Sequence, residues 1–215
     1  MVFPLGAYAQ TEWDILEYEV PAAEKAETKE KKPKKEKKSK KVREIRPEDL
    51  KYMSGSVPVE DGKVVFRLVV DSLDKPASEI YDIVLAYLTK MTLMSNQIEQ
   101  SRIAIQDPDN HDICGIYEEW LTFQDAQLVR DRTRFYYNIL AHCTDGCATI
   151  EICRIHYLYD EYRNPKSFTA EQYITDEYAL TNDKMRLTYN EGKFRKKTIE
   201  RKDYIFRKIS ELLHE

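Results

Sequence analysis

Two long β-rich runs joined by a short turn constrain the fold of this chain more than any other feature. The runs cover residues 134–143 and 147–159, and the tripeptide Thr-Asp-Gly stands between them. An Asp-Gly pair between β-rich runs is the strongest short-range signal for a β-hairpin. The sequence therefore predicts that these two runs pair as neighbouring antiparallel strands.

The register of this hairpin decides the state of the cysteines. A two-residue Asp-Gly turn places Cys143 opposite Ala148 and builds one coherent apolar face. A three-residue loop would instead place Cys143 opposite Cys147, but it would set apolar residues against polar ones further along. Because a one-residue slip moves every side chain to the other face, the apolar match favours the first register. It predicts four free thiols, with Cys143 behaving as a small buried apolar residue.

Three further runs predict strands. Residues 63–72 are apolar and β-branched, and residues 102–106 and 113–123 form a second predicted pair. The turn between that pair, at 107–110, has Pro at its second position with Asp and Asn around it, as turn geometry favours. The sequence thus predicts strands that follow one another along the chain.

Two amphipathic helices are predicted outside this run of strands. Pro76, at a first helical position, precedes apolar residues that recur at helical spacing from Ile80 to Met91. Residues 198–214 have the same spacing, with Thr198 as the expected N-cap. Each helix can bury one apolar face against a core.

The stretch 160–196 gives weaker signals. Thr169 and Gln172 form a capping-box pair, which predicts a short helix from that point. Residues 185–189 are expected to form a strand, followed by a turn at 190–192. The order of elements is then β-α-β-β-β-β, an insert, and a final α.

This order predicts the fold class. Strands that come in runs, instead of alternating with helices, are typical of α+β proteins. We expect an antiparallel sheet of about five to six strands with two main helices on one face. Residues 46–215 should form this domain.

The chain before residue 46 has a different composition. Residues 1–9 are apolar and end in Ala-Tyr-Ala, the small-x-small pattern that precedes signal-peptide cleavage. We expect a signal-peptide remnant whose true start lies upstream of Met1, and hence export to the periplasm or cell envelope. The alternative is an apolar N-terminus without that role. In residues 10–20 successive side chains would fall on alternate faces of an extended chain, and we expect a short edge strand there.

Residues 21–45 are dominated by lysine. Ten basic residues and two acids stand between Lys29 and Arg43, and the run up to Lys41 contains no large apolar residue. Such a run cannot bury enough surface to offset the chain entropy lost on folding, so we expect a disordered linker. It is either a solvated spacer or a patch that makes weak contact with an anionic surface such as lipid, envelope polymer or nucleic acid.

Charge excludes some functions for the chain as a whole. Lys and Arg number 34 against 38 Asp and Glu, a net charge of −4, so no global basic excess recruits nucleic acid. Residues 50–215 also carry more acids than bases, which argues against duplex-DNA binding. Stretches without a formal charge run to about ten residues, well short of the roughly 18 that a membrane span needs.

Three segments resemble a known family. They are 55–66 (GSVPVEDGKVVF), 78–88 (SEIYDIVLAYL) and the stretch from 174 to 206, above all its block GKFRKKTIERKD. They are similar to domain-of-unknown-function family 4468, and the resemblance covers roughly residues 50–215, which is most of the chain. It implies a TBP-like fold and an exported protein of Bacteroidetes. It implies no catalytic residue, and a fold does not by itself carry a function.

The sequence contains no motif of a known catalytic or cofactor site. Gly-rich phosphate loops, HExxH and GxSxG are absent, so we assign no catalytic residue, no cofactor-binding residue and no cofactor. The best metal candidate is His142 with Cys143, Cys147 and Cys153, but its spacing is loose and we expect no metal there. Adjacent His142 and Cys143 would face opposite sides of a strand, which disfavours a Cys–His nucleophile pair.

Charged side chains form two further groups. The acidic pairs Glu118-Glu119 and Asp176-Glu177 are sequence neighbours whose side chains diverge, and we interpret them as surface residues. A basic block stands at the start of the predicted last helix, where cations oppose the helix dipole and require acidic compensation. The block either pairs with the domain's own carboxylates or forms an anion-binding or partner patch. Its members are Arg195, Lys196, Lys197, Arg201 and Lys202.

Two functions from different classes stay open. The first is a non-catalytic envelope module that binds a protein or a small ligand on its sheet face. The missing catalytic motifs and the tyrosines of the strands motivate it, although the tyrosines could instead fill the core. The second is a hydrolase-type enzyme with an unrecognised site in the 160–196 insert, which convergent groups of perturbed pKa would favour. The tyrosines concerned are Tyr136, Tyr137, Tyr157 and Tyr159.

Overall fold

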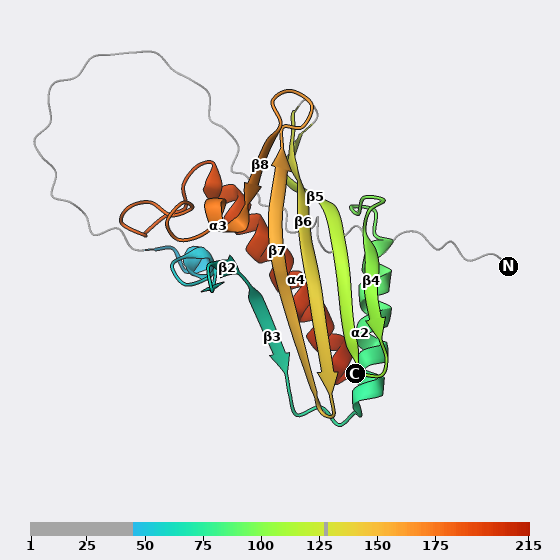
Figure 1. Ribbon diagram of the computed structural model, residues 1–215. Coiled ribbons are helices and arrows are strands. Elements are labelled where there is room, and N and C mark those ends of the chain that lie inside the picture. Colours follow the sequence, from blue (N-terminus) through green and yellow to red (C-terminus); the bar gives the residue numbers. More distant parts are fainter. Residues whose placement is uncertain (1–44, 127–128) are drawn as a thin grey trace, which may run out of the picture. The chain divides into compact units, whose positions relative to one another are not determined.

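An antiparallel six-stranded sheet dominates the computed structural model, which describes residues 45–126 and 129–215 (Figure 1). Five strands lie in the order β3-β7-β6-β5-β4, and β8 pairs with β7 further along the edge that β3 uses. A separate two-stranded sheet joins β1 (Val59–Glu60) and β2 (Lys63–Val64). The six strands are β3 (Phe66–Val70), β4 (Arg102–Asp107), β5 (Asp112–Ala126), β6 (Val129–Thr144), β7 (Cys147–Tyr159) and β8 (Lys166–Thr169).

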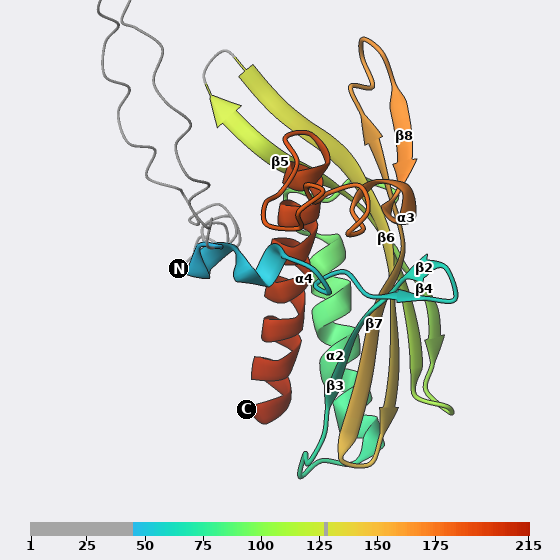
Figure 2. The ribbon, with the colours of Figure 1, turned by 90° about the vertical axis from the view of Figure 1, so that its left-hand side faces the viewer.

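Two long helices cover one face of this sheet. They are α2 (Ala77–Thr92) and α4 (Glu191–His214), which lie side by side on the same face (Figure 2). Two short helices, η1 (Pro47–Tyr52) and α3 (Ala170–Tyr173), pack near the first half of α4. No helix among the described residues covers the other face of the sheet, and none is both long and apolar enough to cross a membrane.

This architecture confirms the predicted fold class and the predicted order of the main elements. Residues Ile45–Glu215 form one compact unit. The predicted signal-peptide remnant (1–9) and edge strand (10–20) lie outside the described residues. So does the Lys-rich linker (21–45), apart from its last residue.

The hairpin of β6 and β7 has the predicted register. Cys143 pairs with Ala148, and Ile139 pairs with Ile152, so one apolar face points toward the helices. Gly146 takes a positive φ of 74°, which glycine adopts without strain in a tight hairpin turn. The Asp145 carboxylate of the same turn accepts a 2.8 Å hydrogen bond from the backbone N–H of Ala77. The turn therefore also provides a hydrogen-bond acceptor for the first backbone N–H of α2. This helix begins one residue later than predicted, with Pro76 as its N-cap.

The core lies between the sheet and the two helices, and aromatic rings fill much of it. The rings of Tyr117 and Tyr137 stack at 5.2 Å, and Phe135 stacks on Tyr157 at 5.5 Å. The core interpretation of the strand tyrosines is thus confirmed for Tyr137 and Tyr157, both fully buried. Tyr136 instead lies on the uncovered face.

The insert between β7 and α4 differs from the prediction. Only α3 forms a helix there. It begins after Thr169, as the capping-box pair predicted, but it ends at Tyr173 and Thr169 makes no side-chain capping bond. Residues 185–189 form no strand, because only an isolated bridge joins Leu187 to Leu180.

The last helix begins much earlier than predicted. It starts at Glu191, after the N-cap Asn190, and the predicted turn at 190–192 belongs to it. Gly192 is needed inside the helix, since a Cβ there would come within 2.7 Å of the Cβ of Leu187. The predicted N-cap, Thr198, lies mid-helix, where its hydroxyl hydrogen-bonds that of Tyr157 at 2.7 Å. The helix-dipole argument for the basic block was therefore wrong.

Glu118 and Glu119 are buried, which corrects their interpretation as surface residues. They diverge as a strand requires: Glu118 pairs with Arg134 on the uncovered face, at 2.7 Å. Glu119 points toward α4 and accepts two 2.7 Å bonds from the guanidinium of Arg201. Asn96 and Gln97 donate further bonds to the same carboxylate. Although burial alone would lower the pKa of Arg201, the Glu119 carboxylate raises it, so the guanidinium is charged.

Replacing Arg201 with Met should lower the free energy of unfolding by about 3–5 kcal/mol, because Glu119 would remain as an uncompensated buried charge. Replacing both Glu119 and Arg201 with Met should cost less than the sum of the two single replacements. Urea unfolding followed by circular dichroism measures both effects.

Arg207→Met is the matched control, since Arg207 pairs with Glu211 on the helix surface. This exposed pair should contribute at most about 1 kcal/mol. A loss on Arg201→Met no larger than that of the control would contradict the assignment.

Candidate functional site

Arg195, in the predicted basic block, is fully buried. Its guanidinium donates to the backbone carbonyls of Tyr52, Met53 and Ile174, at 2.6–2.8 Å. It also forms a 2.7 Å ion pair with Asp176, which ties η1 and the insert to α4. Burial lowers the pKa of Arg195, and the Asp176 carboxylate opposes that shift. The side chain therefore serves as an internal cross-link.

The structure does not bring the five cations of the block together on one surface. Arg201 is as deeply buried as Arg195, and it forms an ion pair with Glu119 of β5. Lys197 pairs with Glu200 at 3.3 Å, and Lys202 pairs with Asp203. The ammonium group of Lys196 lies 5.3 Å from the ring centroid of Tyr52. Pairing with the domain's own carboxylates, the first of the two alternatives, accounts for four of the five side chains.

The predicted metal candidates are also dispersed. His142 lies on the uncovered face, 2.6 Å from the Asp112 carboxylate, whereas Cys143 is buried on the helix face. All four cysteines are free. Among the described residues, no three His, Cys, Asp or Glu side chains gather in an arrangement that could hold a metal ion.

The uncovered sheet face carries apolar side chains on four neighbouring strands, from the edge strand β4 to β7. Cross-strand pairing places Ile105, Cys114 and Leu140 in one row. Ile116 and Cys153 lie in the next row, on either side of Asn138. We call these five apolar residues the apolar patch. Ile105 is 55% exposed and Leu140 is 39% exposed. Contiguous apolar surface of this kind marks an interaction site in a soluble protein more often than isolated exposed residues do.

Polar and aromatic pairs border the apolar patch. On one side, Arg67 binds Glu151 at 2.7 Å. On the other side, the rings of Tyr136 and His156 stack face to face, with centroids 4.3 Å apart. An apolar centre with a polar and aromatic rim is the usual anatomy of a protein–protein interface.

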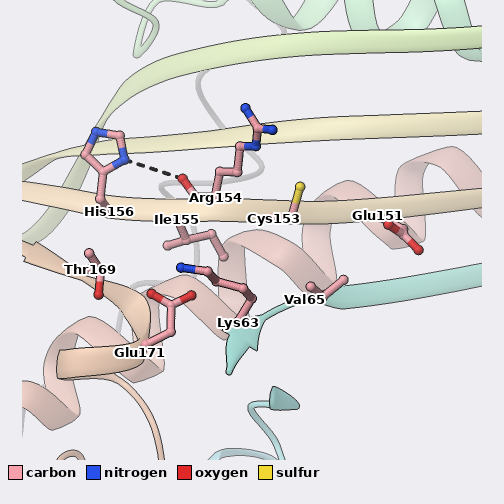
Figure 3. A pocket seen from close by; sticks show the side chains of 9 residues that line it. All are labelled: Lys63, Val65, Glu151, Cys153, Arg154, Ile155, His156, Thr169 and Glu171. Carbon is pink, nitrogen blue, oxygen red and sulfur yellow. Dashed lines mark hydrogen bonds between the residues drawn. The ribbon is translucent and has the colours of Figure 1, made fainter. Parts of the chain in front are cut away.

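A pocket opens in the edge of β7 beside this patch. Pairing with β3 ends at Ile152 and pairing with β8 begins at His156, so no described strand pairs with the edge between them. The gap forms a hollow of about 570 Å³, here called the edge notch (Figure 3). Figure 3 shows Ile155 pointing from β7 toward Lys63, with Glu171 and Thr169 on the α3 side. The lining residues are Lys63, Val65, Glu151, Cys153, Arg154, Ile155, His156, Thr169 and Glu171.

The edge notch holds a thiol and an imidazole, but they are not arranged for catalysis. Nδ1 of His156 lies 3.4 Å from the backbone oxygen of Arg154, and its ring is stacked on Tyr136. Burial raises the pKa of the Cys153 thiol, which disfavours the nucleophilic thiolate. The Glu171 carboxylate accepts a 2.9 Å bond from the backbone N–H of Val64. The notch therefore presents no activated nucleophile. Because most of the surface inside it is apolar, it can receive an apolar group.

Comparison with known proteins assigns the family. Residues 66–158 match the model of a family described as a domain of unknown function (DUF4468) with TBP-like fold. A crystal structure of a DUF4468 family protein from Bacteroides ovatus is similar to this chain, with a TM-score of 0.73 and 31% sequence identity. That similarity covers 79% of this chain and 97% of the other. The chain belongs to the DUF4468 family.

The fold of this DUF4468 domain recurs in a more distant protein. A TBP-like protein from Parabacteroides distasonis has a TM-score of 0.56 and 20% identity, over 73% of this chain and 96% of that one. No protein of curated function matches the chain. The stated family resemblance is thus confirmed, although the family model ends before the C-terminal block that carried it most strongly.

Sequence reasoning missed the surface features of this DUF4468 domain. The signal for the apolar patch was present, because residues 113–123 carry apolar side chains on both parities of the strand. Such a strand is apolar on its outer face as well as its inner one. The edge notch had no sequence signal, since it arises where two short strands share the edge of a third.

Alkylation of the native DUF4468 protein should modify Cys143 last. Its side chain is 1% exposed, and burial raises its pKa to about 11, so little thiolate forms at mildly alkaline pH. Mass spectrometry of the non-reduced protein should also find no bridged peptide. After unfolding in urea, which is the control, all four thiols should react at similar rates. A bridge from Cys143 to Cys147, or equal native rates for these two, would contradict the register.

Proposed function

We propose that this protein is a non-catalytic binding module whose uncovered sheet face takes a protein partner. The observation that carries this proposal is the apolar patch, in which Ile105 and Leu140 are exposed on a sheet whose other face is packed by two helices. Trp, Tyr and Arg dominate the energetics of known interfaces, and Trp120, Tyr136 and Arg134 lie on the same face. The edge notch adjoins the patch through Cys153 and offers a socket for one apolar group of the partner.

The contacts of the insert support a binding module over an enzyme. Asp176 accepts hydrogen bonds from Ser54, Gly55 and Arg195, which lower its pKa although burial alone would raise it. Its carboxylate therefore holds parts of the fold together. Asp183 accepts a bond from the hydroxyl of Thr181 within its own turn. Nothing in the described residues or in the comparisons supports the hydrolase alternative.

We further propose that the module acts outside the cytoplasm. The Ala-Tyr-Ala pattern near residue 9 supports export. The Lys-rich run of residues 21–45 would then connect the exported N-terminus to the domain, with a charge that suits an anionic envelope surface.

A photoreactive residue on the apolar patch should capture the partner. Benzoylphenylalanine in place of Leu140, in the full chain made by its own cells, should give one defined adduct on irradiation. The same residue at Leu93, which is 82% exposed on the helix layer, is the matched control. The adduct at position 140 should disappear when Ile105→Asp is added, because that change charges the same row of the face. No adduct at 140, or the same adduct at 93, would refute the proposed face.

Cell fractionation tests the location separately. The mature protein should be recovered from the periplasmic or envelope fraction, with Gln10 as its first residue. N-terminal sequencing by mass spectrometry measures this directly. A cytosolic product that retains residues 1–9 would overturn the export proposal and leave the apolar patch untouched.

A further inference from the structure

A hollow separate from the edge notch lies where the two long hairpins diverge. Pairing of β6 with β7 ends at Thr133 and Tyr159, yet β6 continues beside β5 beyond that point. Figure 2 shows the end of the β5–β6 hairpin leaning away from the β7–β8 end. The cleft between them has a volume of about 690 Å³, which is the size of a site for a small organic ligand. It lies toward the opposite end of β5 from the apolar patch, so the inference goes beyond the proposed partner face.

Aromatic and apolar side chains give this cleft flat walls. Trp120 comes from β5 and Leu158 from β7, while Tyr162 stands in the turn after β7. The Tyr162 side chain is 81% exposed, which is unusual for a large ring beside a cleft. Tyrosine and tryptophan supply contact area to a ligand at a low cost in side-chain entropy.

Two carboxylates of the cleft already have partners. Asp131 accepts bonds from the ammonium group of Lys193 at 2.6 Å and from the hydroxyl of Tyr159 at 2.9 Å. Glu161 forms an ion pair with Arg134 at 2.5 Å. Burial alone would raise the pKa of Glu161, but hydrogen bonds from Tyr162 and Arg134 lower it, so the group is ionised. Each of these two acids therefore already has a cationic partner within the protein.

Arg132 is different, because its guanidinium lies against an aromatic ring, and the charge of Glu161 acts on it without a direct ion pair. Its central carbon lies 3.6 Å from the ring centroid of Trp120. Among the side chains that the structure describes, no carboxylate forms an ion pair with Arg132. Stacking on an indole fixes the guanidinium plane and strips part of its hydration, while its N–H groups stay available. Such a group is preorganised to bind an oxyanion through two parallel hydrogen bonds.

We propose that this cleft binds a small, singly charged carboxylate with a flat apolar body. The fork of Arg132 takes the carboxylate, and the body of the ligand lies against Trp120 and Tyr162. A single charge is favoured because three acids line the same hollow against two cations, Arg132 and Arg163, and this excess of acid would repel a dianion more strongly than a monoanion. The three acids are Asp131, Asp160 and Glu161. The ligand class follows from this geometry and does not depend on the protein partner proposed above.

Benzoate is a simple probe of this class. Titrating benzoate into the ¹⁵N-labelled full chain should shift the indole N–H resonance of Trp120, which Trp120→Phe identifies. Arg132→Gln should weaken benzoate by about tenfold or more, since a hydrogen-bonded charge is lost. Arg132→Lys should also weaken it, because lysine keeps the charge but not the fork. Arg102→Gln is the matched control, as Arg102 is an exposed arginine on the same face at the β4 edge.

Two further probes make the result decisive. Benzamide, the neutral isostere, should bind at least about tenfold more weakly than benzoate. Phenyl phosphate, a dianion, should bind more weakly as well. The proposal is overturned if benzoate fails to bind, if benzamide or phenyl phosphate equals it, or if Arg132→Gln leaves its affinity unchanged. Retained dispersion of the amide resonances away from the cleft shows that each variant is folded.

Discussion

Two buried arginines on α4 hold the parts of this domain together. Arg195 donates to three backbone carbonyls and one carboxylate that come from η1 and from the insert, segments far apart in the sequence. Arg201 binds Glu119 in the middle of β5. A guanidinium taken out of water must find hydrogen-bond partners for its donors, because burying it without them costs several kcal/mol. This requirement fixes the position of the first half of α4 against the sheet, the insert and η1. The second half then packs Ile205, Ile209 and Leu213 into the core.

Apolar patterns explain where the sequence predicted the structure correctly, and buried charged residues explain where it did not. The hairpin of β6 and β7 could be predicted in register, because only one pairing keeps the apolar residues on one face. The helix α2 could be predicted because its buried residues are apolar. The start of α4 could not, because Arg195, a buried position in its first two turns, reads as solvent-exposed charge. Glu119 was misread for the same reason: a buried ion pair looks like two surface residues until its partner is known.

Aromatic packing explains why the insert has little regular structure of its own. Phe194, fully buried at the start of α4, contacts the rings of Tyr157, Phe168 and Tyr173 at centroid distances of 4.9–6.4 Å. These rings come from β7, β8 and α3, so tertiary contacts determine the path of the chain here. The Thr169–Gln172 pair therefore located the start of α3 but not its end, because tertiary packing around Phe194 decides how far the helix extends.

The edge notch and the cleft beside Arg132 both form where regular strand pairing is interrupted. A positive φ of 53° at Arg154 accompanies the register shift between β6 and β7, which increases strand twist as a β-bulge does. Beyond it, β7 exchanges β3 for β8 as its edge partner, and the exchange leaves the edge notch. Splitting the edge into two short strands also protects the sheet against edge-to-edge association. Further along, the hairpins diverge and open the cleft beside Arg132. The irregularities that shorten the edge strands of this sheet are thus the same ones that shape its two hollows.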